Sequence, residues 1–532
     1  MTAYDAPVST VATEAGPSPA DEPVPEITQR RLTPLVPPHD PWSWVVAAVV
    51  TTIAAIVRLV DLSRPGHIVF DETYYAPNAW ALVQYGVEWE VAEGGANPVD
   101  GAPVLGDGPA FVVHPPLGKW LIGLGEWAFG YTPFGWRIAA ALAGIISVLL
   151  VARIARRLFG STMLGAAAGL LVALDGMHVV MSRTALLDIF LLLFVVAGFG
   201  ALLLDRDQRR SRWLAALAAG RDRPGFGVPW WRLAAGALLG CALAVKWSAV
   251  AFIPVFLGLA LWWEVSARRT AGVRRPWRDT VAGQWRGFVA ATVLIPVVYL
   301  ATWIGWFTSD HGFYRHAPVD AQGEPWPARV VAALRNLYEY HAQALTFHSG
   351  LDATHPYESP AWQWLLLARP IAFHYSDQGG CGAEHCASAV LLLGTPLLWW
   401  SFLPALAALV WLGVARRDWR AGAILLGVAA GIGPWFLFDD RVMFYFYALP
   451  AQPFLVLAVV YVLGAVMSSA RPRSTGDTGT ILGVDRRTFG AVLVGGYVIL
   501  VALTFAYFYP VYSAQLIPYE SWQARMWLDT WI

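Results

Sequence analysis

Residues 186–204 read LLDIFLLLFVVAGFGALLL, and Asp188 is the one charged side chain among them. A run of about 20 apolar residues is long enough to cross the hydrocarbon core of a bilayer as a helix. Apolar runs of similar length recur along the chain, which predicts an all-α polytopic membrane protein with about eleven transmembrane helices. We place these spans at residues 43–60, 135–155, 163–181, 186–204, 231–246, 248–265, 286–307, 388–415, 421–438, 443–467 and 488–510.

The composition of the chain agrees with this fold class. Of its 532 residues, 57% are hydrophobic and 14% are charged, whereas a soluble domain carries about 25% charged residues. Lys and Arg together number 37, as do Asp and Glu, and a net charge of zero argues against a general nucleic-acid binder. Residues 1–40 are rich in Pro, Ala and acidic side chains and are predicted to be a disordered tail. They lack the segments of a cleavable signal peptide.

The distribution of arginine predicts how the chain is oriented in the membrane. Short cytoplasmic connections carry an excess of Lys and Arg. If the tail is cytoplasmic, 25 of the 37 basic residues fall on inner connections. The inner arginine clusters are interpreted as a solvated face that anchors lipid headgroups. Two long connections, 61–134 and 308–387, then lie outside, and chemistry is expected on that extracytoplasmic side.

Two adjacent carboxylates, Asp71 and Glu72, follow the exit of the first span by about ten residues. Adjacent acids on a helix or strand cannot both point into one small site, so one can act while the other orients. A carboxylate near a low-dielectric interface can have a raised pKa and serve as a general base. The alternative is a solvated acidic turn.

Cationic and proton-donating side chains are predicted on the same side of the membrane. Only two lysines occur in the chain, and ionisable residues within apolar runs are costly and mark function by default. For the segment from His114 to Lys119, the structural alternative is a rigid turn with a snorkelling lysine. For Asp188, it is a buried pair with Arg183. Arginine grips phosphate oxygens in a bidentate manner, so these groups together suit an anionic lipid headgroup. The candidate phosphate-binding residues are Arg58, His114, Lys119, Arg137, Arg183, Lys246 and Arg441.

The second long loop carries aromatic side chains beside histidines. His348, His355, Tyr357 and Trp362 suit contacts with a sugar or an acceptor, and an aromatic belt at the membrane interface is the alternative. Cys381 and Cys386 are close neighbours in a polar stretch. They are a candidate disulfide if this stretch faces an oxidising compartment, and two free thiols otherwise.

These motifs resemble the protein O-mannosyltransferase family, which is glycosyltransferase family 39 of the polytopic GT-C superfamily. The resemblance is carried by Phe70-Asp71-Glu72, His114-Pro115-Pro116-Leu117-Gly118-Lys119, Ser182 to Asp188, Lys246-Trp247, His355-Pro356-Tyr357 and Arg441 to Pro450. It extends from about Arg58 to Pro510. The dominance of arginine and the acidic tail indicate an actinobacterial type of member. The resemblance implies a GT-C catalytic domain over residues 41–532, in which residues 388–510 form a C-terminal four-helix membrane region.

The resemblance also implies an activity. Members transfer mannose from polyprenyl-phosphate-mannose to Ser or Thr hydroxyls of proteins that emerge across the cell membrane, with inversion at the sugar. Asp71 and Glu72 match the Asp-Glu motif of the family, with Asp71 expected as the base and Glu72 as the orienting group. No metal or cofactor is expected to be required beyond the lipid-linked donor. The expected partners are membrane lipid, secreted or translocating acceptor proteins and the protein-translocation channel.

One departure from the family pattern concerns the connection between the seventh and eighth spans. Eukaryotic members carry a β-trefoil (MIR) domain there, and about 80 residues leave no room for it in this chain. Two other hypotheses remain open at this stage. One is a GT-C transferase that moves a polyprenyl-phosphate-linked sugar to a lipid or a polysaccharide. The other is a lipid-phosphate flippase or transporter.

Overall fold

The computed structural model describes residues 24–36, 40–351, 354–377, 379–438, 441–468, 480–481 and 484–532. Of the predicted tail, residues 1–23 and 37–39 lie outside this description. Within the remainder, α1 (Glu26–Leu32) is a helix, where the composition predicted disorder. Leu32 is fully buried and packs with Trp213, so a tertiary contact stabilises this short helix.

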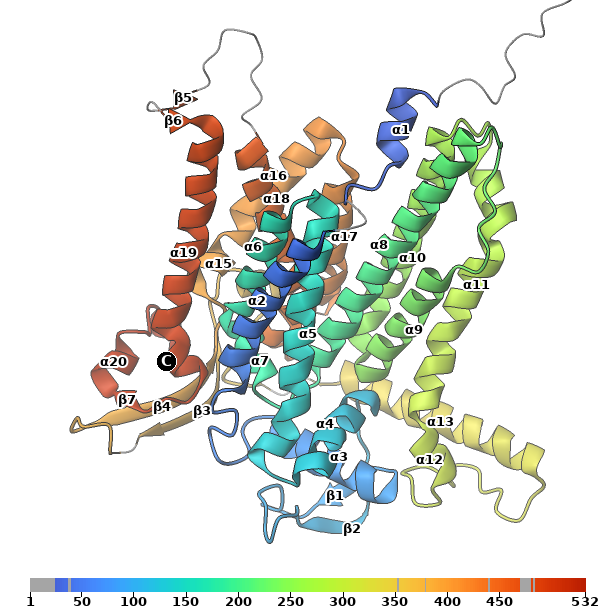
Figure 1. Cartoon of the computed structure of the whole chain (residues 1–532). Coiled ribbons are helices and arrows are strands. Elements are labelled where there is room, and N and C mark those ends of the chain that lie inside the picture. Colours follow the sequence, from blue (N-terminus) through green and yellow to red (C-terminus); the bar gives the residue numbers. More distant parts are fainter. Residues whose placement is uncertain are drawn as a thin grey trace, which may run out of the picture.

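Long helices run side by side through the molecule (Figure 1). They are apolar along most of their length, and helices that are hydrophobic all round belong in a bilayer or a large core. The first part of the bundle consists of α2 (Pro41–Leu59), α5 (Pro133–Phe159), α6 (Thr162–Ala173), α7 (Gly176–Ser182), α8 (Asp188–Ala218), α9 (Trp230–Val245), η1 (Trp247–Ala251), α10 (Phe252–Thr270) and α11 (Pro276–Thr302).

The second part of the bundle follows a long connection. It consists of α15 (Pro396–Trp400), α16 (Phe402–Arg416), α17 (Trp419–Ile432), η2 (Gly433–Leu437), η3 (Tyr445–Ala451), α18 (Gln452–Ser468) and α19 (Arg486–Tyr512). The short strands β5 (Thr480–Ile481) and β6 (Val484–Asp485) precede α19. α18 packs against α6 and α17, so the two parts form one bundle.

The eleven predicted spans all find helices in the described residues. Nine helices are long and apolar enough to cross a membrane, and α6 and α7, bent by 64°, add a tenth if they are one broken span. The 16-residue helix α9 occupies the place of the predicted span 231–246. The chain is therefore a multi-pass membrane protein.

The predicted span 388–415 is wrong at its beginning. Residues Cys386–Leu392 form strand β4, all of whose residues are buried, and the spanning helix begins at Pro396. β4 pairs antiparallel with β3 (Ile371–Asp377) and with β7 (Ile517–Pro518). An apolar run buried on both faces of a sheet has the same hydropathy as the start of a membrane helix, so the sequence did not distinguish them.

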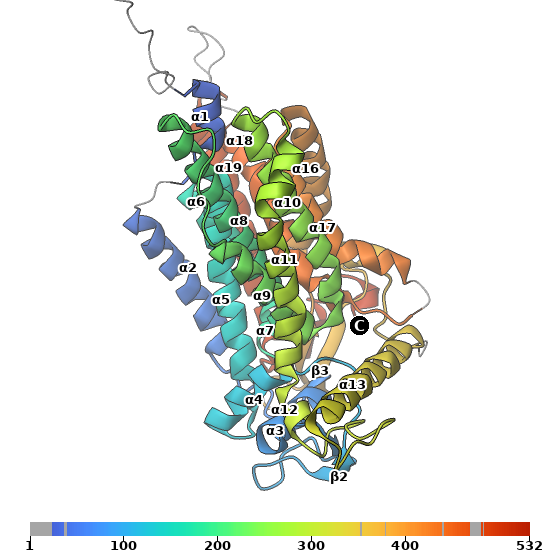
Figure 2. The ribbon, with the colours of Figure 1, turned by 90° about the vertical axis from the view of Figure 1, so that its right-hand side faces the viewer.

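The two long connections lie together at one end of the bundle, called here the loop end (Figures 1 and 2). The first contains α3 (Glu72–Tyr85), the hairpin of β1 (Trp89–Val91) and β2 (Leu105–Pro109), and α4 (Leu117–Phe129). The second contains α12 (Ile304–Thr308), α13 (Trp326–Ser349), α14 (Ala361–Trp364), β3 and β4. Both views show α13 running obliquely to the long helices. The C-terminal segment adds α20 (Tyr519–Gln523) and η4 (Asp529–Trp531) at this end.

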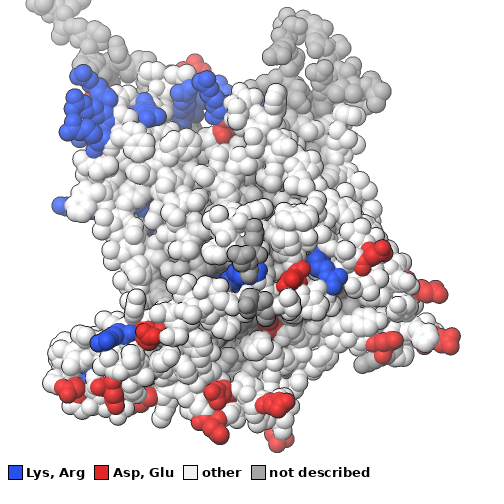
Figure 3. All heavy atoms as spheres, turned by 180° about the vertical axis from the view of Figure 1, so that it is seen from behind, with Lys and Arg blue, Asp and Glu red and all other residues white. Residues whose placement is uncertain are grey.

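The opposite end of the bundle is rich in arginine. In Figure 3 basic side chains gather at that end and acidic side chains at the loop end, with a largely uncharged band between them. The interpretation of the arginine clusters as a solvated face is wrong in part. Arg232 is fully buried and donates to Asp205 and Glu264, at 2.7 Å each. Arg268, also buried, pairs with Glu264 and Asp279. These ion pairs join α8, α9, α10 and α11.

Candidate active site

A cavity of about 1480 Å3 lies at the loop end, where the two long connections meet the bundle. Its wall is built by α3, the segment before α4, the α9–η1 junction, the end of α13 and the region from η2 to η3. Of the residues predicted to act, six line the cavity: Asp71, His114, Lys246, His348, His355 and Arg441.

Asp71 stands at the entrance of α3, where the chain turns into the helix. Phe70, just before it, has a left-handed backbone (φ 47°) and stacks on Phe373 of β3, with ring centroids 4.4 Å apart. No hydrogen bond to the Asp71 carboxylate occurs among the described residues. Burial raises the pKa of Asp71 to about 6, with a smaller increase from Asp188 and a decrease from Lys246. A carboxylate with this pKa is ionised at neutral pH and basic enough to accept a proton.

Glu72 points away from the cavity into the protein. Its two oxygens accept hydrogen bonds from Nε and Nη2 of Arg137, both at 2.8 Å. The backbone N–H groups of Val69 and Ala185 donate to the same carboxylate at 3.1 and 2.9 Å. Both Glu72 and Arg137 are fully buried. The first turn of α3 thus sends two adjacent acids in different directions, one to the cavity and one to a structural ion pair.

Lys246 lies in the break between α9 and η1, with its ammonium group facing the cavity. Its Nζ donates to both oxygens of Asp188, at 2.9 and 3.0 Å. It also lies 5.0 Å from the ring centroid of Tyr447 and 5.5 Å from that of Phe446. The structural alternative in which Asp188 pairs with Arg183 is therefore wrong. Arg183 instead donates to backbone carbonyls at the end of α2.

Arg441 contributes a second cation to the cavity lining. Its guanidinium group lies 6.0 Å from the ring of Trp435. Its Nε is buried and has no hydrogen-bond partner in the described part of the chain. An arginine donor without a partner is suited to an anionic group such as a phosphate.

His114 and His348 form a stacked pair in the cavity wall, with centroids 5.1 Å apart and planes at 28°. Burial lowers the pKa of both rings, and the charge on Lys246 lowers it further, so both are neutral at pH 7. The neutral His348 donates from Nε2 to the Val113 carbonyl at 3.1 Å. His355 also lines the cavity and packs edge-on against Phe444. These rings offer hydrogen bonds and flat surfaces rather than charge.

Four candidate phosphate-binding residues do not line the cavity. Their donors form hydrogen bonds with other groups of the protein. Arg58 donates to the carbonyls of Ala54, Val172 and Ala173 and to side chains of α7. Arg137 is used by Glu72 and by the carbonyls of Leu62, Pro65 and His67, and Arg183 by those of Val57, Arg58, Val60 and Asp61. Lys119 is fully buried, pairs with Glu88 at 2.7 Å and donates to the His114 carbonyl.

Two predicted acceptor or sugar contacts also lie outside the cavity. Trp362 is 60% exposed on α14. Tyr357 packs under the guanidinium group of Arg369, which lies 5.4 Å from the centroid of the tyrosine ring.

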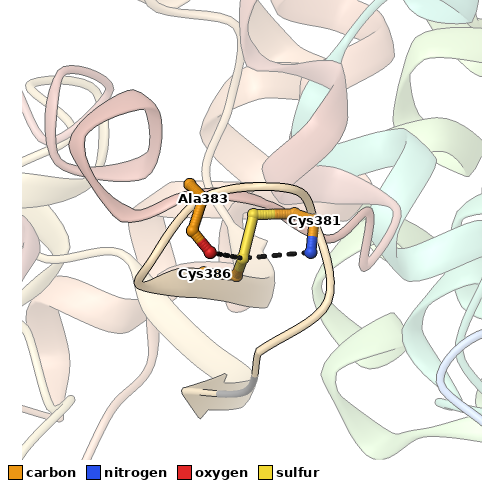
Figure 4. The surroundings of a disulfide bond; sticks show 3 residues. All are labelled: Cys381, Ala383 and Cys386. Atoms are coloured by element: carbon orange, nitrogen blue, oxygen red, sulfur yellow. Dashed lines mark hydrogen bonds between the residues drawn. A yellow bond between two sulfur atoms is a disulfide. The ribbon is translucent and has the colours of Figure 1, made fainter.

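Cys381 and Cys386, the candidate disulfide, form a disulfide in the turn between β3 and β4 (Figure 4).

Two cavity residues on the same face of α3 as Asp71 were not among the predicted site residues. Tyr75 and Asn78 of α3 line the cavity, and they follow Asp71 by four and seven positions. That spacing places all three on one face of a helix, so periodicity within the first loop was the signal that could have found them. Tyr447 and Trp435, whose rings stack 4.5 Å apart in the cavity lining, have no such signal.

Comparison with known proteins places this arrangement in a family. Residues 48–309 match a family described as dolichyl-phosphate-mannose-protein mannosyltransferase, and residues 333–531 match the C-terminal four-TMM region of protein-O-mannosyltransferase. A polyprenol-phosphate-mannose–protein mannosyltransferase of Mycobacterium tuberculosis is 43% identical over 504 residues, 92% of each chain. The chain belongs to the protein O-mannosyltransferase family. A relative of the same name from Mycolicibacterium smegmatis is 40% identical over 94% of this chain and 96% of its own.

The membership of the family also accounts for the fold. A chain of the S. cerevisiae protein O-mannosyltransferase Pmt1-Pmt2 complex bound to the sugar donor superimposes with a TM-score of 0.69, at 15% identity over 94% of both chains. The predicted GT-C membrane fold is thus confirmed. The family match and the relatives above show that this member of the family is an enzyme, a glycosyltransferase. Within the described residues, no group of three or more His, Cys, Asp or Glu side chains is placed to hold a metal ion.

Proposed function

We propose that the chain transfers mannose from polyprenyl-phosphate-mannose to Ser or Thr hydroxyls of proteins, with Asp71 as the general base. The observation that carries this proposal is the position of Asp71 in the cavity. Its carboxylate faces the same space as two cations, Lys246 and Arg441. A base and an anion-binding pair on one cavity are what a glycosyl phosphate donor and a hydroxyl acceptor require.

The lining of the cavity supports a lipid-linked donor. The part formed by the end of α9, η1, α10 and η2 is apolar and includes Leu243, Val250, Phe252, Pro434 and Leu437. The part formed by α3 and the β1–β2 hairpin is more polar and includes Thr73, Asn78, Glu90 and Asn97. We assign the apolar part to the polyprenyl chain and the polar part to the acceptor. Asp71 lies where the acceptor hydroxyl would reach the sugar.

The reaction is a single displacement. Asp71 accepts the proton of the Ser or Thr hydroxyl, and the oxygen forms a bond with C1 of mannose. The bond between C1 and the phosphate oxygen breaks, and its electron pair leaves with polyprenyl phosphate. One displacement inverts the configuration at C1. Lys246 and Arg441 stabilise the charge that develops on the leaving phosphate, because fixed cations in a partly dry site need no reorganisation.

The remaining sequence-derived candidates receive positioning roles in this proposal. Arg137 and Arg183 hold the chain between α2 and α3 through its carbonyls. Arg58 holds the end of α6 and the side chains of α7, and Glu72 anchors the first turn of α3. Lys119 fixes the segment that carries His114. His114 and His348, both neutral, are placed to hydrogen-bond sugar hydroxyls, and His355 lies near the donor end.

The location of the enzyme follows from the charge asymmetry of the molecule. We assign the arginine-rich end to the cytoplasm and the loop end to the outer face of the cell membrane. The acceptor would then be a secreted or translocating protein that reaches the cavity from outside. Docking of the enzyme to the protein-translocation channel would bring such chains to the hairpin side of the cavity before they fold.

The test uses membranes that contain the protein, polyprenyl phosphate carrying radiolabelled mannose and a Thr-rich peptide. Wild type is compared with Asp71→Asn, which keeps the size of the side chain and removes the base. Label in the peptide that is lost in the variant supports the reaction and the base together. Label in a lipid or glycan would assign a different acceptor, and equal labelling by the variant would exclude Asp71 as the base.

A further inference from the structure

A buried polar network lies among the spanning helices, apart from the cavity, and Asp175 is at its centre. Asp175 is fully buried at the break between α6 and α7. Its Oδ1 accepts hydrogen bonds from the Thr395 backbone N–H at 3.0 Å and from Trp399 Nε1 at 2.7 Å. Its Oδ2 accepts from the His178 N–H and from Gln452 Nε2, both at 3.3 Å. A carboxylate at this depth is costly, and such residues are functional by default.

The donors that reach Asp175 come from the C-terminal part of the bundle. Thr395 and Trp399 lie where β4 leads into α15, and Thr395 Oγ1 also bonds both sides of the break, donating to the Leu174 carbonyl and accepting from the Gly176 N–H. Gln452 directly follows η3, the element that carries the cavity residue Tyr447. Asp175 therefore fixes the start of α7 against the elements that form the C-terminal wall of the cavity.

The other end of α7 leads to the loop that carries the base. Three residues after α7 ends at Ser182, the N–H of Ala185 donates to Glu72 Oε1 at 2.9 Å. Between them, Arg183 holds the carbonyls of Val60 and Asp61, at 2.7 and 2.8 Å, where the first span ends. α7 is thus bonded at its start to the C-terminal wall and at its end to the residue beside Asp71.

Arg58 and His178 keep α7 in place along its length. Arg58 Nη2 lies 2.9 Å from His178 Nδ1, and because arginine can only donate, Nδ1 must be the acceptor. His178 Nε2 then carries the proton and donates to Ser147 Oγ of α5 at 2.9 Å. Arg58 also donates to the carbonyl of Ala173 at the end of α6. The side chains of Asp175, His178 and Arg58 thus tie the break to α5, to α6 and to the start of the C-terminal part of the bundle.

We propose that Asp175 is a positioning residue for sugar transfer, which holds α7 between the two walls of the cavity. It thereby sets the separation between Asp71 and Tyr447 of η3, which both line the cavity. The inference rests on the proposed function. A displacement of about 1 Å between reacting groups can lower a rate by about 100-fold, so a small shift of α7 is sufficient to impair transfer.

The test compares Asp175→Asn with Asp418→Asn in the full-length protein in lipid nanodiscs. Asp418 is a matched control, because it also caps a spanning helix and accepts hydrogen bonds from the Arg420 N–H at 3.0 Å and the Tyr461 hydroxyl at 3.1 Å. It belongs to the arginine-rich end, where α17 begins. We expect Asp175→Asn to lower kcat by about 10- to 100-fold with little change in the KM for the donor. Asp418→Asn should leave kcat unchanged, even if both variants melt at lower temperature.

Two further variants keep the test decisive. Trp399→Phe removes one hydrogen bond to Asp175 and retains most of the ring packing, so it should lower kcat even if Asp175→Asn does not fold. In a Glu72→Gln background, Asp175→Asn should have little further effect, because the two residues act through one path. A kcat near wild type in folded Asp175→Asn or Trp399→Phe would overturn the inference, as would fully multiplicative losses with Glu72→Gln. A wild type that transfers no mannose would refute the proposed function instead.

Discussion

The raised pKa of Asp71 predicts an acid limit to the reaction. With a pKa of about 6, about one tenth of the carboxylates are ionised at pH 5 and about nine tenths at pH 7. Only the ionised form accepts a proton, so kcat/KM should fall about tenfold between these pH values. We use kcat/KM because it depends on ionisations of the free enzyme and free substrates. The product phosphate, whose second pKa is about 6, therefore does not affect it.

The charge on Lys246 gives this prediction a direction that a substitution can test. Lys246 lowers the pKa of Asp71, and Asp188 raises it. Lys246→Met removes the first effect and leaves the Asp188 carboxylate without its partner, so the acid limit should move to higher pH, by about 1 unit. The reaction will also slow, because Lys246 is assigned to the phosphate. The informative quantity is therefore the pH at which kcat/KM falls to half its maximum, and not the maximum rate of the variant.

The only other lysine in the chain provides the control. Lys119 also pairs with a carboxylate, Glu88, but lies outside the cavity lining. Lys119→Met should leave the acid limit near pH 6. The assay measures initial rates of label transfer to a Thr-rich peptide between pH 4.5 and 8. A limit near pH 4 in wild type, or the same limit in Lys246→Met, would refute the reasoning. Because His348 also titrates below its usual range, a limit that disappears in His348→Gln would assign it to that ring.

Three further predictions concern neighbouring groups. Glu72→Gln leaves the buried Arg137 with an unpaired charge, so it should lower the free energy of unfolding by about 3–5 kcal/mol. Activity should fall as well. A melting temperature equal to that of wild type would contradict the structural role of Glu72. Arg441→Ala should raise the KM for the donor about tenfold, as expected for the loss of one charge-assisted hydrogen bond, and leave the melting temperature unchanged. An unchanged KM would show that Arg441 does not bind the donor phosphate. Reduction of the Cys381–Cys386 bond should add the mass of two hydrogens and leave transfer nearly intact, since no described residue of its turn lines the cavity. A large loss of activity would show that the turn contributes to the reaction.

The membrane architecture could be predicted from sequence because the signal is strong and local. An apolar run of sufficient length has few alternatives to a spanning helix, and the placement of arginine orders the connections. The same criterion failed at Cys386–Leu392, where burial in a sheet produces the same hydropathy as burial in lipid. It also gave no sign that α6 and α7 would be separate helices bent by 64°.

The residues of the site were predictable in kind but less so in arrangement. Asp71 could be found because it begins a helix just after a span, and its partner Glu72 had to point elsewhere. The pairing of Lys246 with Asp188 joins residues 58 positions apart, and no sequence pattern indicated it. The choice between Arg183 and Lys246 as the partner of Asp188 depended on where α9 breaks, which is a property of tertiary packing.

The cations show how a phosphate site can be distinguished from a scaffold in a membrane enzyme. An arginine whose terminal amino groups reach backbone carbonyls, as Nη1 and Nη2 of Arg183 do, fixes the path of the chain. Arg137 satisfies the same description, with the Glu72 carboxylate in addition. Arg441 retains a buried donor without a partner in the described residues, and Lys246 is shared between one carboxylate and the cavity. Leaving donors unused in a low-dielectric wall is costly, and an anionic ligand offsets that cost when it binds. We therefore expect substitution of Arg183 to change stability first and donor affinity second, and substitution of Arg441 to do the reverse.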